Sequence, residues 1–136
     1  MNTNTLDALI RLADAYRMAG QPEPALTHLA EVKRFAETTQ TKWVQAEALR
    51  LQGDLLTLTG DHTAAEASFR DAIALAERQS ARLFQLRAST SLARLWRDQG
   101  RRTEARDLLA LIYGWFTEGI DAPDLKEAKT LLDELA

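Results

Sequence analysis

The sequence predicts an all-α solenoid, a superhelix of three helical hairpins followed by a capping helix. Glycines stand forty residues apart, at Gly20, Gly60 and Gly100. Two further sets of residues recur at the same interval. One is alanine, at Ala25, Ala65 and Ala105, and the other is large and apolar, at Leu29, Phe69 and Leu109. Each unit divides at its glycine into two segments with the apolar spacing of amphipathic helices. Repeats of such length are typical of solenoids, which usually hold a partner along a surface.

The first unit covers about residues 5–40. Its first helix is predicted to end at Gly20, because a glycine closes a helix in the left-handed conformation at little cost. Its second helix is expected over about 22–39, since Pro22 and Pro24 are tolerated only in a first turn. The unit is therefore a helical hairpin.

The second and third units, about residues 41–79 and 80–119, repeat this arrangement. Asp61 directly follows the turn glycine and is predicted to be an N-cap. Small residues recur where two helices must approach closely, at Ala13, Gly53 and Ala93. A last amphipathic helix is expected over about 123–135, where it would cover the apolar face that a solenoid leaves open at its end.

Composition agrees with one domain over residues 1–136, with 46% apolar and 27% charged residues. The net charge of -3 gives no overall basic field, so charge alone does not favour nucleic acid as a partner. The chain has no cysteine, which excludes disulfides and thiolate chemistry and suits a cytoplasmic location. No apolar run reaches the roughly 18 to 20 residues of a membrane span, so no membrane association is expected.

One spacing pattern recurs across the hairpins: a small residue, a large residue three positions on, a turn glycine, an alanine and a large apolar residue. It is fullest at Ala93, Trp96, Gly100, Ala105 and Leu109. This pattern resembles the tetratricopeptide repeat, and the resemblance covers almost the whole chain. It implies a TPR-like superhelix whose first helices line a concave groove that binds proteins. The forty-residue interval exceeds the family's usual interval of about 34 residues, which implies longer helices.

A narrower resemblance is to the carboxyl-terminal repeats of large bacterial signalling proteins, which join a class III nucleotide cyclase, a nucleotide-binding ATPase and a helical repeat tail. It rests on five stretches, residues 43–56, 64–69, 91–101, 113–119 and 124–135. Neither the metal-binding aspartates of a cyclase nor a phosphate-binding glycine-lysine loop is found in the sequence. The resemblance therefore implies a regulatory or scaffolding tail without catalysis.

The two histidines are the first candidates for chemistry, since His28 and His62 each have an acid within one helical turn, Glu31 and Glu66. Such a pair could contribute to a metal site, but the two stand at non-equivalent positions of different units, which favours ordinary surface histidines. No serine stands in a nucleophile elbow, and the glycines do not cluster into a phosphate-binding loop. No catalytic residue, cofactor or metal is predicted.

The tetratricopeptide resemblance assigns the candidate binding residues, because in that family the first helices line the groove. The expected partner-binding groove comprises Asp14, Arg17, Glu47, Arg50, Asp54, Arg87, Thr90, Arg94 and Arg97. Along these surface-facing positions the charge is mixed at the amino-terminal end and basic at the carboxyl-terminal end. Such a groove could hold an acidic or extended peptide by bidentate arginine–carboxylate contacts. A solvated charged face is the alternative.

Two other functions stay open. Nothing comparable to the capping helix precedes Leu6, so the amino-terminal hairpin is a candidate surface for self-association into a homo-oligomer. The arginines at the basic end could instead contact the phosphates of a nucleotide or nucleic acid, although the net acidity disfavours this. Trp43, Trp96 and Trp115 are interpreted as core or hairpin-contact residues rather than as stacking platforms.

Overall fold

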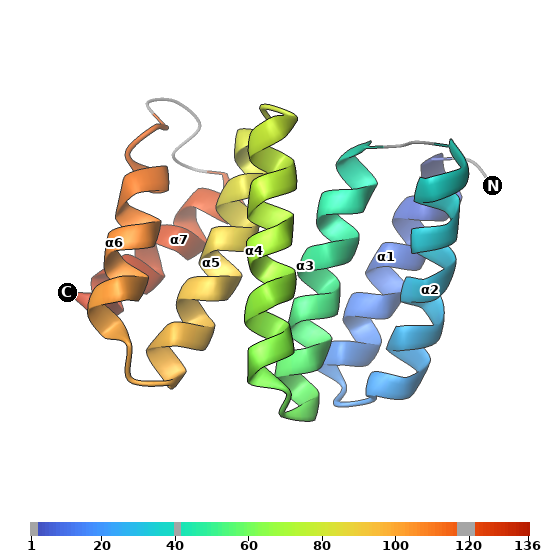
Figure 1. Cartoon of the computed structure of the whole chain (residues 1–136), viewed down its shortest axis with the longest axis horizontal. Coiled ribbons are helices and arrows are strands. Elements are labelled where there is room, and N and C mark those ends of the chain that lie inside the picture. The colour runs from blue at the N-terminus through green and yellow to red at the C-terminus, as the bar shows by residue number, and fades with distance from the viewer. Residues whose placement is uncertain (1–2, 40–41, 117–121) are drawn as a thin grey trace.

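The computed structural model describes residues 3–39, 42–116 and 122–136, and these form seven α-helices and no strand (Figure 1). The helices are α1 (Thr3–Met18), α2 (Pro22–Thr39), α3 (Lys42–Thr59), α4 (His62–Arg78), α5 (Arg82–Asp98), α6 (Arg102–Tyr113) and α7 (Pro123–Leu135). The predicted all-α solenoid of three hairpins and a last helix is confirmed. Within the described residues, no helix has the length and apolar character that crossing a membrane requires.

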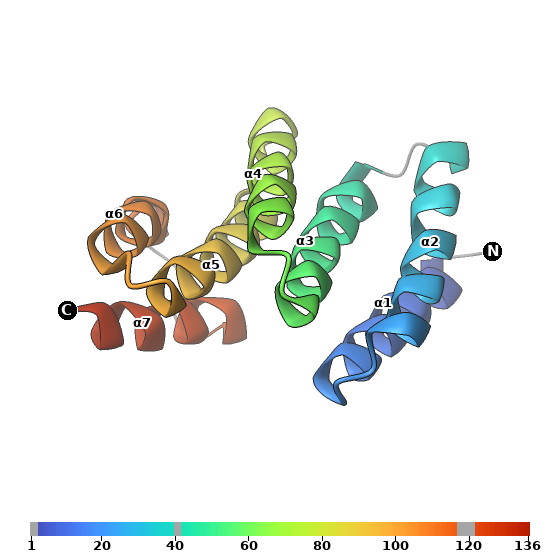
Figure 2. The ribbon, with the colours of Figure 1, turned by 60° about the horizontal axis from the view of Figure 1, so that its bottom comes forward.

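The helices form an arch with two layers. Figure 2 shows α1, α3, α5 and α7 on its inner side and α2, α4 and α6 on its outer side. Each inner helix contacts the next inner helix, whereas no contact joins α2 to α4 or α4 to α6 among the described residues. The inner layer is therefore a continuous wall, and the outer helices are held through it.

Glycines set the turn within each hairpin. Gly20, Gly60 and Gly100 have φ of 72°, 93° and 82°, the left-handed region that a glycine adopts without strain. The residue after each glycine donates its N–H to the carbonyl five positions back, which satisfies one of the last carbonyls of the inner helix. The predicted N-cap is confirmed, because Asp61 Oδ1 accepts the N–H of Ala64 at 3.2 Å.

A close approach between α3 and α4 requires the glycine at position 53. A Cβ atom built there would lie 2.5 Å from Cε1 of Phe69, a ring that is buried. The equivalent positions of the other hairpins combine an alanine with a leucine, as Ala13 with Leu29 and Ala93 with Leu109. The second hairpin therefore pairs a smaller residue, Gly53, with a larger one, Phe69. This exchange keeps the packed volume similar in the three hairpins.

Helix α7 is a fourth inner helix as well as a cap. It packs on α5 and α6 as α3 packs on α1 and α2. Its buried residues stand forty positions after buried residues of α5: Leu125, Ala128, Leu131 and Leu135 after Gln85, Ala88, Ser91 and Leu95. The four leucine and alanine side chains join the core of the second and third hairpins. Helix α7 therefore occupies the place of the first helix of a fourth unit.

Among the described helices, α1 is the one inner helix with no other inner helix packed on its amino-terminal side. Leu12 of α1 is 41% exposed, whereas Leu92 at the equivalent position of α5 is 1% exposed. Ala15 is also exposed, and Leu55 and Leu95 at its equivalent positions are buried. The face of α1 that corresponds to the buried faces of α3, α5 and α7 is thus open to solvent. The side chain of Leu6 lies outside the described ones.

The tryptophans differ from one another. Trp96 is buried, as expected for a core residue. Trp115 is 40% exposed, with the guanidinium of Arg82 on α5 5.2 Å from its ring centroid, so it is a hairpin-contact residue rather than a core residue. It lies just beyond α6, which ends at Tyr113. The side chain of Trp43 is not among the described ones.

Candidate binding groove

The inner helices enclose a groove of about 470 Å³. Four arginines and five carboxylates line it together with threonine, serine and a few apolar side chains. Seven of the nine residues predicted from the sequence are in this lining: Asp14, Arg17, Arg50, Asp54, Arg87, Thr90 and Arg94. The other two, Glu47 and Arg97, lie beside it in ion pairs with residues of the same surface. The structure therefore brings the predicted side chains together on one surface.

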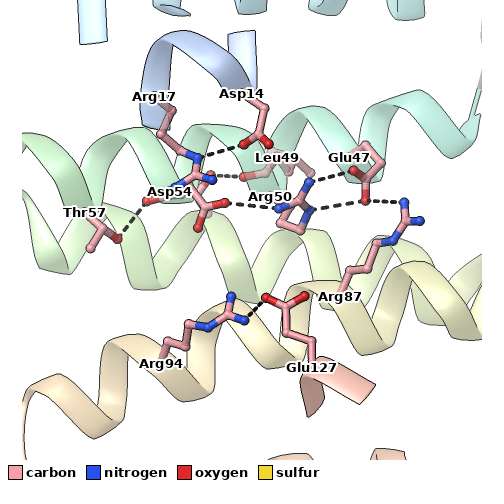
Figure 3. A network of polar contacts seen from close by, with 12 residues as sticks. Asp14, Arg17, Glu47, Leu49, Arg50, Asp54, Thr57, Arg87, Arg94 and Glu127 are labelled. Atoms are coloured by element: carbon pink, nitrogen blue, oxygen red, sulfur yellow. Dashed lines mark hydrogen bonds and ion pairs between the residues drawn. The ribbon is translucent and has the colours of Figure 1, made fainter. Parts of the chain in front are cut away.

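Ion pairs occupy the middle of the groove (Figure 3). On α1, Arg17 Nε lies 2.8 Å from Asp14 Oδ1. On α3, Arg50 contacts two carboxylates, with Nη2 2.9 Å from Glu47 Oε2 and Nη1 3.1 Å from Asp54 Oδ2. These spacings of three and four residues are those that bring two side chains together on one helix. The local helical geometry therefore accounts for the pairs.

Burial shifts the ionisation of the groove residues. Burial raises the pKa of Asp54, and the positive charges of Arg50 and Arg17 offset only part of this effect. Burial lowers the pKa of Arg94, although the charge of Asp54 opposes the shift. Burial acts to lower the pKa of Arg50, but the charge and hydrogen bond of Glu47 together with the charges of Asp54 and Asp14 raise it above its usual value. The charged groups of the groove are thus partly shielded from water, and the pKa of each depends on the charges of its neighbours.

At the carboxyl-terminal end, three arginines of α5 meet three carboxylates of α7. The pairs are Arg87 with Asp124, Arg94 with Glu127 and Arg97 with Glu134. The nitrogen–oxygen distance is 2.8 Å in the first pair and 2.7 Å in the third. The expectation of a basic end is wrong, because it counted only the first helices of the hairpins and left out the charges of α7.

Glu47 and Thr90 also differ from expectation, since both were expected on the surface and each is 4% exposed. Glu47 lies between two guanidinium groups, those of Arg50 and Arg87, the second at 3.6 Å. The Thr90 hydroxyl donates to the Leu86 carbonyl at 2.8 Å within α5. The contact of Glu47 with Arg87 joins two inner helices, so the pattern of a single helix does not reveal it.

Eight lining residues were not among the nine predicted for the groove: Thr57, Leu58, Phe69, Ser91, Leu95, Asp98, Asp124 and Glu127. Two of them belong to α7, which was interpreted only as a cap. A signal for its position was present, because Ala8, Ala48, Ala88 and Ala128 keep the forty-residue interval across all four inner helices. That series places α7 in the inner layer and hence its carboxylates near the groove.

The two histidines lie in different surroundings. Within the described part of the chain, no group of three or more histidine, aspartate or glutamate side chains could hold a metal ion. His62 is exposed, as predicted, but His28 is half-buried and its ring stacks on Tyr16 with centroids 5.6 Å apart. The surface assignment is wrong for His28 because α1 covers one face of its ring.

A concave groove lined by the inner helices of an α-solenoid defines a class, the helical-repeat proteins. The family model described as tetratricopeptide repeat matches residues 86–111, which lie in α5 and α6. This match supports a tetratricopeptide repeat protein and includes the pattern first seen at Ala93, Trp96, Gly100, Ala105 and Leu109. No curated protein and no solved structure matches the chain. Tetratricopeptide repeats generally mediate protein–protein interaction.

Proposed function

We propose that the chain is a non-catalytic protein-interaction module that binds a segment of a partner protein in the groove of α1, α3, α5 and α7. The groove itself carries this proposal: it is concave, about 470 Å³ in volume, and lined by hydrogen-bonding side chains from four helices. The tetratricopeptide match over α5 and α6 supports the same class of function.

The arginines of the groove suit a partner segment that carries carboxylates. Their side chains keep exposures between 18% for Arg50 and 39% for Arg94, so a ligand can reach them. A carboxylate of the partner can replace an internal one without leaving a guanidinium unpaired. A nucleotide or nucleic acid is a weaker candidate, because the lining holds more carboxylates than arginines and would repel phosphates.

The exposed apolar side chains Leu58 and Leu111 allow a direct test of the groove. Leu58 lines the groove and is 45% exposed, whereas Leu111 on α6 is 65% exposed and is not in the lining. A photo-crosslinking residue at position 58 is expected to capture the partner, and the same residue at position 111 is the matched control. Capture at position 111 alone would place the binding surface outside the groove.

We further propose that the module is the regulatory tail of a larger bacterial signalling protein that acts in the cytoplasm. The five stretches that resemble such tails support this, and the lack of cysteine suits a reducing compartment. The gene region upstream of Met1 tests it. A reading frame that continues into a cyclase or ATPase domain is expected, and an in-frame stop codon there would argue against a tail.

Self-association is a second candidate, favoured by the open face of α1. Leu12 is exposed on this face, while the equivalent faces of α3, α5 and α7 are covered by a preceding helix. A second copy of the chain could supply that cover. Ultracentrifugation tests the idea: a concentration-dependent dimer that Leu12→Glu abolishes is expected, and a monomer at every concentration would exclude it.

A further inference from the structure

Helix α7 uses two separate stripes of side chains. One stripe is apolar and buried against α5 and α6: Leu125, Ala128, Leu131 and Leu135, each at most 3% exposed. The other stripe is acidic and meets the arginines of α5: Asp124, Glu127 and Glu134. The apolar stripe accounts for the attachment of the helix, because burial of large apolar side chains contributes far more than half-exposed ion pairs.

The arginines of α5 form a row that follows the groove wall. Arg87, Arg94 and Arg97 are spaced seven and three residues apart on one helix, and their side chains are 35%, 39% and 29% exposed. Burial lowers the pKa of Arg94, and the positive charges of Arg97, Arg17 and Arg50 add to this shift. Such a row requires counter-charges. Helix α7 supplies one carboxylate to each arginine, in addition to Glu47 beside Arg87 and Asp98 beside Arg97.

We propose that the acidic stripe of α7 is a built-in ligand of the arginine row, and that it sets the affinity of the groove for acidic protein segments. This inference rests on the proposed function, since it concerns what the same groove binds. A partner carboxylate then competes with the side chains of Asp124, Glu127 and Glu134 for the row. The helix itself stays docked through its apolar stripe while these side chains rotate away.

The test uses the full chain and a fluorescently labelled hexaglutamate peptide as the probe. The variant Asp124→Asn/Glu127→Gln/Glu134→Gln removes the three competing charges and keeps the size of each side chain. It is expected to bind the probe about tenfold more tightly than the unaltered chain, which is the combined effect of three half-exposed ion pairs. Replacing Arg87, Arg94 and Arg97 with glutamine in the same variant is expected to remove the gain.

A control variant separates this effect from a change in net charge. Asp71, Glu77 and Asp107 are exposed on the outer helices, and Asp71→Asn/Glu77→Gln/Asp107→Asn changes the net charge equally. This variant is expected to bind the probe with less than half of the gain. An equal gain in both variants would overturn the inference, because the effect would then be one of overall charge.

Two further measurements keep the outcome interpretable. Circular dichroism checks that helicity is unchanged, and Glu127→Gln/Glu134→Gln retains Asp124, the acid in the first turn of α7, in case its loss frays the helix. Equal probe affinity in the unaltered chain and both α7 variants would overturn the inference and leave the proposed function standing. Crosslinking at position 58, which needs no acidic probe, tests the proposed function independently.

Discussion

Trp96 Nε1 donates a hydrogen bond of 2.7 Å to Glu66 Oε1, which joins the last turn of α5 to the first turns of α4. The same carboxylate accepts from Arg101 Nη1 at 2.8 Å, and the Arg101 and Arg70 guanidinium groups lie 4.6 and 5.4 Å from the indole ring centroid. This cluster connects α4 of the second hairpin to α5 and to the α5–α6 turn of the third.

Glu66→Ala is expected to destabilise the chain by about 1–3 kcal/mol, because it leaves the nearly buried indole N–H without its acceptor. Urea unfolding followed by circular dichroism measures the change. Glu77→Ala on the same helix is the control, since Glu77 is exposed, and it is expected to have little effect. Equal destabilisation by both variants would show that the cluster contributes nothing specific.

The stability contributed by Glu66 is expected to depend on pH. The hydrogen bond from Trp96, followed by those from Arg101 and Arg70, lowers the pKa of Glu66 below its usual value of 4.5 in spite of partial burial. A carboxylate with a lowered folded-state pKa stabilises the protein above its unfolded-state pKa, and this contribution is lost as the pH falls through the folded-state value. The stability difference between the unaltered chain and Glu66→Gln should therefore shrink below about pH 4.5. A difference that is constant from pH 7 to 3 would contradict this.

Gly53→Ala is expected to destabilise the chain by about 1–2 kcal/mol. The added methyl group would overlap the Phe69 ring, and the cost of overpacking exceeds the gain in helix propensity. Gly53→Ala/Phe69→Leu reproduces the combination found in the other two hairpins and should recover part of the loss. Thermal unfolding of the single and double variants measures this coupling, and additive losses would argue against it.

Ser89→Ala is expected to leave stability unchanged or to raise it by up to about 1 kcal/mol. The Ser89 hydroxyl is fully buried and has no hydrogen-bond partner among the described residues, so its removal abolishes a desolvation cost. Ser68→Ala is the matched comparison, because that buried hydroxyl donates to the Leu49 carbonyl at 3.0 Å. Ser68→Ala should lose about 1 kcal/mol in chemical denaturation. The idea fails if the two variants lose stability equally.

Ser80→Gly is expected to stabilise the turn between α4 and α5 by about 0.5–1 kcal/mol. Ser80 is the one non-glycine residue with positive φ in the described chain, at 55°. Gly100→Ala is the converse change and should destabilise the chain by about 1–2 kcal/mol. A Cβ atom at that position would meet no other atom, so the cost comes only from the left-handed backbone conformation. Melting temperatures of both variants check the pair, and shifts of the same sign would contradict the argument.

The helices and their order were predictable from the sequence because they depend on local spacing. The interval from Gly20 to Gly100 fixed the hairpins, and a cap such as Asp61 needs only its own turn. The face that each inner helix buries also follows from periodicity. These features involve residues within one helix or one hairpin.

The charge of the groove was not predictable in the same way. Arg87 and Asp124 are 37 residues apart in the chain, and their pairing depends on how α7 docks against α5. The burial of Glu47 likewise depends on the guanidinium of the next inner helix. The sequence therefore identified seven of the fifteen lining residues but not the partners of the arginines on α5, since those contacts join different helices.

Helix α7 gives the inner wall one more helix than the outer layer has in the described chain. With inner helices about 8–10 Å apart, the distance from the axis of α1 to that of α7 is roughly 24–30 Å. An extended peptide rises about 3.3 Å per residue, so a ligand that touches all four helices needs about eight residues. Without α7 the same wall would serve about six. Helix α7 therefore increases the length of the partner segment that the groove can contact.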